Sequence, residues 1–149
     1  MDIVHEGASG RLRALPTRLV NQVALLANRA TERALAETGS RRYHYALLAT
    51  LDEFGPDSQA ELGRRTGIDR SDMVAAVNEL TDRGFVTRSP DPGDRRRNIV
   101  SLTRSGADHL RELDDRLAVA QDELLVGFSA AERANFILML NRILERHSR

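Results

Sequence analysis

The sequence DPGDRRRNIVSLT, residues 91–103, decides the fold of this chain. Residues 98–102 alternate in the manner of a β-strand, and residues 85–89 alternate in the same way. The two segments predict a hairpin, with residues 90–97 as its turn region. The arginines expected at the hairpin tip, directly before the returning strand, are Arg95, Arg96 and Arg97.

Two short helices are predicted upstream of the hairpin. Ser58 and Glu61 fit a capping box, in which the serine side chain bonds the third backbone N–H and the glutamate returns the bond. Asp69 fits the N-cap of a second helix over residues 70–83, which Gly84 ends in a left-handed conformation. Such a pair beside a cationic hairpin is what a winged DNA-binding domain needs, because the second helix can enter the major groove while the arginines reach phosphates or the minor groove.

The second helix has one core face. Met73, Val77 and Leu80 fall on that face and are expected to be buried. The residues that fall on its other faces are Arg70, Ser71, Asp72, Ala75 and Asn78.

The chain before these helices divides into three parts. Residues 1–10 show no periodicity and are expected to form a flexible arm. Over residues 12–38 apolar residues recur three and four apart, which predicts one long helix that Pro16 can break near its start. A shorter helix is predicted over residues 43–54.

Two further helices are predicted after the hairpin. Thr103 caps a long helix that Gly127 ends, and a second capping box at Ser129 and Glu132 opens the last helix. The apolar stripes of the first and last helices exceed what a compact unit of this size can cover, so these helices are expected to pair with a second copy of the chain.

The expected fold is therefore mainly α with a small β-hairpin wing. It is a winged helix-turn-helix with long N- and C-terminal dimerisation helices. The expected parts are a flexible arm at residues 1–10, a helical dimerisation region at residues 11–41 and 104–149, and a DNA-binding domain at residues 42–103.

Composition narrows the function further. The chain has 149 residues, 41% of them hydrophobic, and no cysteine, which excludes disulfides, thiolate metal sites and cysteine redox switches. Without a secretory-signal pattern or a run of about 18 apolar residues, it is expected to be cytoplasmic, with no membrane partner. The net charge is zero, but residues 58–104 carry nine arginines against seven acids, so positive charge gathers in the expected DNA-binding part.

No catalytic or metal-binding pattern is found in the sequence. The histidines His5, His44, His109 and His147 have no pair three or four residues apart. There is no phosphate-binding glycine loop and no nucleophile elbow. The chain is therefore predicted to have no metal, no cofactor and no enzymatic activity.

The wing segments GFV (84–86), DPGDRR (91–96) and VSLT (100–103) together resemble the MarR family of bacterial transcriptional regulators. In that family the wing reads as an Asp-x-Arg pair, matched here by Asp94 and Arg96, followed by a Leu-Thr that starts the next helix. With the flanking long helices, the resemblance covers nearly the whole chain.

The resemblance implies a homodimer that binds double-stranded DNA. Two recognition helices would enter successive major grooves of a pseudo-palindromic operator. It also implies a pocket between the dimerisation helices and the winged domain. In this family small phenolic or aromatic acids bind there and weaken DNA binding, so a repressor released by a small-molecule effector is expected.

The wing residues receive roles from the resemblance. Arg96 is expected in the minor groove, with Asp94 holding its geometry, whereas Arg95 and Arg97 are expected to contact phosphates.

The recognition helix departs from the family's pattern. Val74 and Ala75 stand where many members have Thr and Arg, and Asp72 stands where Thr is common, whereas Arg70 and Ser71 match. Base reading is then expected from Arg70 toward a guanine and from Ser71. Asp72 would accept from a cytosine amine or serve only as a favourable acid in the first turn, and Ala75 could contact a thymine methyl.

Residues outside the wing and the recognition helix have two interpretations each. Ser58 and Gln59 could bind a phosphate through backbone N–H groups or only cap their helix, and one of Arg64 and its neighbour Arg65 is expected to face the DNA backbone. The candidate ligand-binding residues are His44, Arg18, Arg42 and Tyr43, against half-buried structural or solvated positions as the alternative.

Two alternative functions stay open. The first is a dimeric partner-binding protein on a winged-helix scaffold without its own operator, which the neutral net charge and the apolar Val74 and Ala75 favour and the three-arginine wing opposes. The second is a small enzyme that uses the cleft between helices, for which the sequence offers no catalytic constellation.

Overall fold

The computed structural model describes residues 2–148. Its elements in chain order are α1 (Gly10–Arg13), α2 (Pro16–Leu35), α3 (Arg42–Phe54), β1 (Asp57–Ser58), α4 (Gln59–Thr66), α5 (Arg70–Asp82), β2 (Val86–Asp91), β3 (Asp94–Leu102), α6 (Arg104–Leu124) and α7 (Ala130–His147). Met1 and Arg149, the ends of the predicted arm and dimerisation region, lie outside the described residues.

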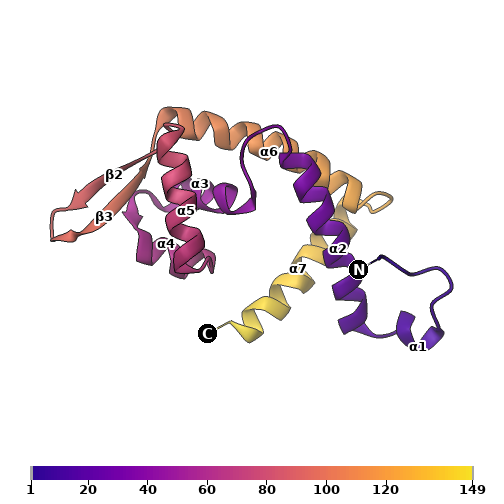
Figure 1. Ribbon diagram of the computed structural model, residues 1–149. Helices are drawn as coiled ribbons and strands as arrows, with labels where there is room; N and C mark the ends of the chain where they lie inside the picture. The colour runs from indigo at the N-terminus through magenta and orange to yellow at the C-terminus, as the bar shows by residue number, and fades with distance from the viewer. Residues whose placement is uncertain (1, 149) are drawn as a thin grey trace.

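The long helix α6 joins two parts of the molecule (Figure 1). One part is a winged-helix body of α3, α4, α5 and the β2–β3 hairpin, and the other contains α2 and α7. The three short strands form one antiparallel sheet in the order β1-β3-β2. The predicted fold, mainly α with a small wing, is confirmed.

The core lies inside the winged-helix body, where α3, α5, the sheet and α6 meet. Leu47 of α3 and Val100 of β3 are fully buried. Met73, Val77 and Leu80 of α5 are 2%, 1% and 0% exposed, which confirms the predicted core face of that helix. Burial of these side chains fixes the outward face of α5, because residues on the opposite side of the helix must point to solvent.

Side-chain caps start the helices where the sequence predicts them. Asp69 accepts a hydrogen bond from the N–H of Asp72 at 2.8 Å, and Thr103 accepts one from Gly106 at 3.0 Å. At the start of α7 both bonds of the capping box between Ser129 and Glu132 are present.

The predicted capping box at Ser58 is only half formed. The Ser58 hydroxyl accepts from the N–H of Glu61 at 3.2 Å, but the N–H of Ser58 donates to the Asp57 carboxylate at 2.8 Å. The Glu61 side chain pairs with Arg64 instead. The prediction of a reciprocal bond was wrong because Asp57, one residue earlier, supplies a nearer acceptor.

The turn of the wing is shorter than predicted. The N–H of Gly93 donates to the Asp91 side chain at 2.9 Å, so the chain reverses over two residues rather than over residues 90–97. The arginine run 95–97 accordingly belongs to β3, just beyond the tip. Pro90 pairs with Asn98, and Asp91 with Asp94, so the arginine run lies at an irregularity of the β2–β3 register. Strand β1, which pairs with β3, was not predicted.

The predicted helix over residues 12–38 is interrupted and ends early. Pro16 occupies the first turn of α2, and Leu15 before it is extended, as the residue preceding a proline prefers. The helix ends at Leu35, and Glu37 takes a left-handed φ of 69°. The segment before α1 contacts α2, since the N–H of Val4 donates to the Gln22 side chain at 2.8 Å.

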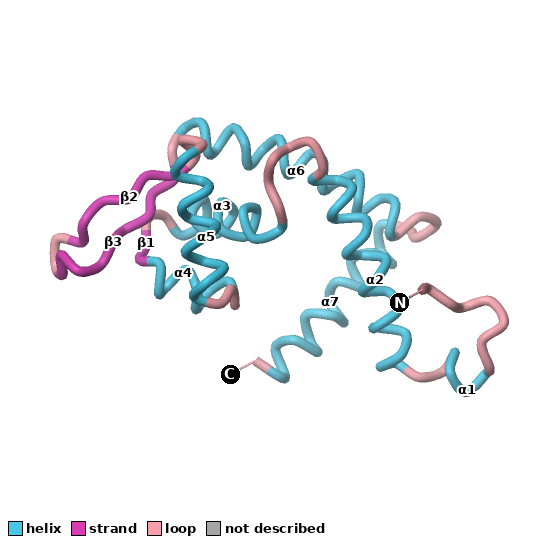
Figure 2. The backbone as a smooth tube through the Cα atoms, in the orientation of Figure 1, coloured by secondary structure: helices cyan, strands magenta, loops and turns pink. Residues whose placement is uncertain are grey.

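The two flanking helices differ in how much they are covered. α2 packs along α6, whereas α7 has no buried residue and projects from the end of α6 (Figure 2). No helix within residues 2–148 is both long and apolar enough to span a bilayer.

Candidate nucleic-acid interface

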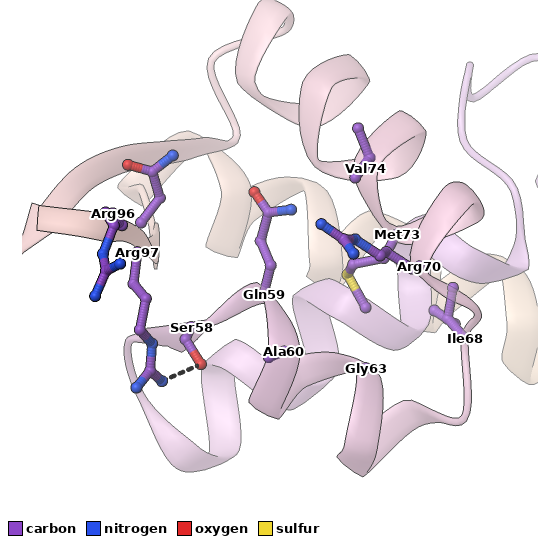
Figure 3. A pocket seen from close by; sticks show the side chains of 11 residues that line it. Ser58, Gln59, Ala60, Gly63, Ile68, Arg70, Met73, Val74, Arg96 and Arg97 are labelled. Atoms are coloured by element: carbon purple, nitrogen blue, oxygen red, sulfur yellow. Dashed lines mark hydrogen bonds between the residues drawn. The ribbon is translucent and has the colours of Figure 1, made fainter. Parts of the chain in front are cut away.

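A hollow of about 590 Å³ lies between the wing and the second helix of the helix-turn-helix. We call it the wing–helix hollow. Its walls come from the start of α4, the start of α5 and strand β3. Figure 3 shows the side chains of Gln59 and Arg70 extending into this space from α4 and α5, with Arg96 and Arg97 on the side of the wing.

The side chain of Arg96 on the wing is 93% exposed. The Asp94 carboxylate accepts the backbone N–H of Arg96 at 3.0 Å and lies 3.4 Å from its Nε. Asp94 therefore holds the backbone of Arg96 and the Nε end of its guanidinium, while the rest of the guanidinium points to solvent. Arg95 is exposed as well.

Arg97 differs from its two neighbours because it is tied to the body. Its Nη2 donates to the hydroxyl of Ser58 at 3.0 Å, and its Nε lies 4.0 Å from the Asp91 carboxylate. Ser58 is itself 3% exposed, so this contact joins the wing to the N-terminus of α4 (Figure 3). Arg97, which is predicted to contact a DNA phosphate, is thus already bonded to Ser58 within the chain.

The outward face of α5 carries Arg70, Ser71, Val74 and Ala75, all exposed. Asp72 is only half exposed and turns toward the N-cap, where partial desolvation and the carboxylate of Asp69 raise its pKa. Asn78 accepts a hydrogen bond from Arg88 of β2 at 2.6 Å. The residues left to face a ligand are those of the first two turns.

Arg64 does not face the hollow. It pairs with Glu61 on its own helix, and this ion pair lowers the pKa of Glu61. Arg65 covers the ring of Phe54 at 4.0 Å and lies 3.9 Å from Asp57. Of the residues predicted at the helix start, Ser58 and Gln59 line the hollow.

Comparisons with known proteins agree with a winged-helix geometry of this kind. Residues 38–97, the helix-turn-helix with most of the wing, match the model of the MarR family. The transcriptional repressor NicR of Pseudomonas putida is 38% identical over 104 residues, 68% of this chain and 64% of NicR.

The chain belongs to the MarR family. Its fold matches the PcaV transcriptional regulator of Streptomyces coelicolor in complex with its natural ligand, with a TM-score of 0.78 and 28% identity over 93% of this chain and 97% of PcaV. A probable transcriptional regulator of Pseudomonas aeruginosa gives a TM-score of 0.79 and 28% identity over 89% of this chain and 99% of its own. The chain spans 53–64% of the length of the curated relatives it matches.

The residues that the MarR resemblance suggested for a ligand pocket do not converge on one cavity. His44 is 2% exposed, and both ring nitrogens have partners: Nδ1 accepts the N–H of Arg41 at 2.8 Å, and Nε2 lies 2.8 Å from the Glu79 carboxylate. Burial is the main cause that lowers the pKa of His44. The imidazole is thus a neutral structural link between α3 and α5.

The other three pocket candidates have partners within the chain. Arg18 of α2 donates to the carbonyls of Val4 and Leu12 and so holds the N-terminal segment. The Arg42 guanidinium lies 5.1 Å from the ring centre of Tyr43 and 3.4 Å from its hydroxyl.

Sequence reasoning missed the residues that join α5 to the rest of this MarR-family chain. Arg83, at the end of α5, donates to the carbonyl of Thr38 at 2.8 Å, to that of Gly39 at 3.0 Å and to the hydroxyl of Ser40 at 2.8 Å. Ser40 in turn lies 2.7 Å from Nε2 of His109 on α6. These partners are far apart in sequence, and no local pattern points to them.

Proposed function

We propose that this protein is a homodimeric, sequence-specific DNA-binding transcriptional regulator that represses a pseudo-palindromic operator and is released by a small ligand such as an aromatic acid. The observation that carries the DNA-binding part is the wing–helix hollow. Exposed cationic groups border it, among them Arg70 on the recognition helix and Arg96 on the wing.

The chemistry of the hollow suits a DNA duplex. Arg70 is in the first turn of α5, where a guanidinium can bond guanine O6 and N7 while the helix end lies in the major groove. Arg96, held by Asp94, extends from the wing toward the neighbouring minor groove, where the potential is most negative. Arg95 and the N-terminus of α4 at Gln59 supply further phosphate contacts, and Ser71 takes part in base reading. Ser58, whose N–H and hydroxyl have partners within the chain, acts as the cap of α4.

The homodimer is supported by an uncovered apolar surface, which we call the terminal apolar surface. It includes Leu15, Val23 and Leu26 of the N-terminal helices and Ile137, Leu140, Ile143 and Leu144 of α7, each at least 38% exposed. So many exposed apolar side chains on the flanking helices indicate an interface, and two copies related by a two-fold axis cover them for each other. Residues 11–41 and 104–149 then form the dimerisation region, residues 42–103 the DNA-binding domain, and residues 1–10 an arm that the hydrogen bonds of Val4 to Gln22 and Arg18 hold against α2.

Release by a ligand rests on the relatives. NicR is named a repressor, and PcaV is described in complex with its natural ligand. In this chain Arg42 and Tyr43 at the start of α3 offer a cationic and a hydroxyl group to an acidic ligand, whereas Arg18, the third polar candidate, is bound to the carbonyls of Val4 and Leu12. His44 would act only by positioning this helix start, since its nitrogens are occupied.

Binding to duplex DNA tests the proposal. Fluorescence anisotropy with the DNA upstream of the protein's own gene, and a scrambled duplex as control, is measured at several salt concentrations for the wild type and for Arg96→Ala. Each phosphate-like contact contributes roughly one unit to the slope of log K against log salt, so Arg96→Ala should weaken binding and flatten the slope by about one unit. Arg111→Ala removes the same charge from an exposed site on α6 and should change neither.

Equal affinity and slope for Arg96→Ala and the wild type would refute the assignment of the wing. No preference over scrambled DNA, followed by no enrichment in a genome-wide selection of bound fragments, would favour a partner-binding protein on the same scaffold. The exposed Val74 and Ala75 on the recognition helix are the observation that keeps this alternative in view.

A further inference from the structure

The recognition helix exposes a branched apolar side chain beside its arginine. Val74 is 42% exposed and lines the wing–helix hollow together with Arg70, one helical turn earlier. Figure 3 shows Val74 pointing away from α5 on a different side from the buried Met73. Ala75, the next residue, is exposed too. Val74 therefore faces the space that DNA would occupy, and a second apolar side chain lies exposed beside it.

The polar residues around Val74 are held by partners within the chain. The Asn78 side chain accepts a hydrogen bond from Arg88 at 2.6 Å. Asp72 lies beside Asp69 at the N-cap, half removed from solvent. The outward surface of α5 thus combines hydrogen-bonding groups at its first two residues with an apolar patch one helical turn further along, at Val74 and Ala75.

The major groove offers one apolar group that such a patch can bind, the C5-methyl of thymine. A valine suits this contact because branching at Cβ restricts χ1 and gives its two methyl groups a fixed position. We propose that Val74, with Ala75 beside it, determines specificity by packing against a pyrimidine C5-methyl group, which in unmodified DNA is that of thymine. This inference rests on the proposed DNA-binding function.

The spacing within α5 gives the proposal a geometric consequence. Arg70 and Val74 are four residues apart, about 6 Å along the helix axis. Because stacked base pairs are about 3.4 Å apart, the thymine read by Val74 should lie within about two base pairs of the guanine read by Arg70. Each operator half-site should contain this guanine–thymine pair of contacts.

The test uses a randomised duplex pool, from which the protein itself selects the sequences that it binds. The most enriched sequence is resynthesised with deoxyuridine in place of single thymines, which removes only the methyl group. Affinities are measured for the full-length wild type, for Val74→Ala, and for Val119→Ala as a control at an exposed valine of α6. Circular dichroism checks that each variant is folded.

At one thymine of each half-site, deoxyuridine should weaken wild-type binding about fourfold, the factor that corresponds to roughly 0.8 kcal/mol for one methyl-sized group. Val74→Ala should bind the two duplexes with nearly equal affinity, while Val119→Ala behaves as the wild type. Equal losses in the wild type and Val74→Ala, or no loss in the wild type, would overturn the inference and leave DNA binding intact. If the wild type enriches no sequence, the proposed function fails, and the inference fails with it.

Discussion

At the scale of single residues, three adjacent arginines of the wing have different environments. Arg96 is oriented by Asp94 and otherwise free to reach DNA, whereas Arg97 is bound to the buried Ser58. Both environments occur within one strand, at the irregularity of the β2–β3 register. The sequence RRR alone could not distinguish these roles, because it gives three equal charges.

Gly106 is the residue at which a single added carbon has the clearest consequence. A Cβ there would lie 2.0 Å from the carbonyl oxygen of Phe85, which is rigid backbone. Although alanine favours helices over glycine, Gly106→Ala should therefore destabilise the protein by about 1–3 kcal/mol, measured by urea unfolding. Gly10→Ala, at a helical site with nothing within 4 Å, should leave the free energy of unfolding nearly unchanged. Equal stabilities for the two variants would contradict the close approach of α6 to Phe85.

At the scale of elements, the segment between α2 and α3 joins the recognition helix to the helices outside the winged-helix body. Arg83 at the end of α5 bonds this segment, and its guanidinium lies 4.7 Å from the ring centre of Phe85. Phe85 stacks on His109 of α6 at 4.2 Å. These contacts join the end of α5 to the segment after α2 and to the start of α6.

Replacement of Arg83 tests this junction. Arg83→Met keeps much of the side-chain volume but removes three hydrogen bonds to the segment, two of them to backbone carbonyls. We expect a loss of about 1–3 kcal/mol in the free energy of unfolding, because these acceptors lose a charged donor. Arg111→Met, at an exposed site of α6, is the control and should stay close to the wild type. A stability of Arg83→Met equal to that of the control would show that the junction does not contribute.

Two buried histidines of the same region predict the pH dependence of stability. Burial is the largest cause that lowers the pKa of both His44 and His109 below 6.5, and the charge of Arg83 lowers both pKa values further. Glu79 acts in the opposite direction on His44, and Glu112 does so on His109. The unfolded chain therefore binds protons more readily than the folded one. Stability should be complete above pH 6.5 and decrease as the pH falls through 6.5 toward the lower pKa of the folded state.

The melting temperature at pH 7.5 and pH 5.5 measures this effect. His109→Gln should reduce the difference between the two temperatures, since glutamine does not titrate and can still bond Ser40. His147→Gln, at an exposed position of α7, should keep the wild-type difference. A wild-type protein that melts at the same temperature at both pH values would contradict the burial of neutral imidazoles.

At the scale of the whole molecule, the winged-helix body has a complete core, whereas the helices that extend from it do not. The core side chains of α3 and α5 are nearly all covered within one chain. In α7, by contrast, Ile137 and Leu144 are 55% and 64% exposed. A single chain therefore folds its DNA-binding part and leaves its terminal apolar surface for a second copy.

Charge on the terminal apolar surface should separate the two copies. Leu140→Glu with Leu144→Glu places two carboxylates one turn apart on α7, and burial of unpaired charge is strongly unfavourable. We expect the doubly charged variant to sediment as a monomer, whereas the wild type sediments as a dimer. Phe54→Glu, which charges an exposed aromatic position of the winged-helix body, should remain a dimer. If the doubly charged variant still sediments as a dimer, the interface lies elsewhere.

The sequence by itself determined the features that depend on near neighbours in the chain. The caps at Asp69, Thr103 and Ser129 and the buried face of α5 follow from spacings of three and four residues, which a helix imposes locally. The wing segments also indicated the MarR family. Only the tertiary structure decided that Arg97 bonds Ser58, that Arg83 holds the segment before α3, and that α6 passes too close to Phe85 for a side chain at position 106. These contacts join residues that are 39, 45 and 21 positions apart in the chain, and chain packing rather than local periodicity brings them together.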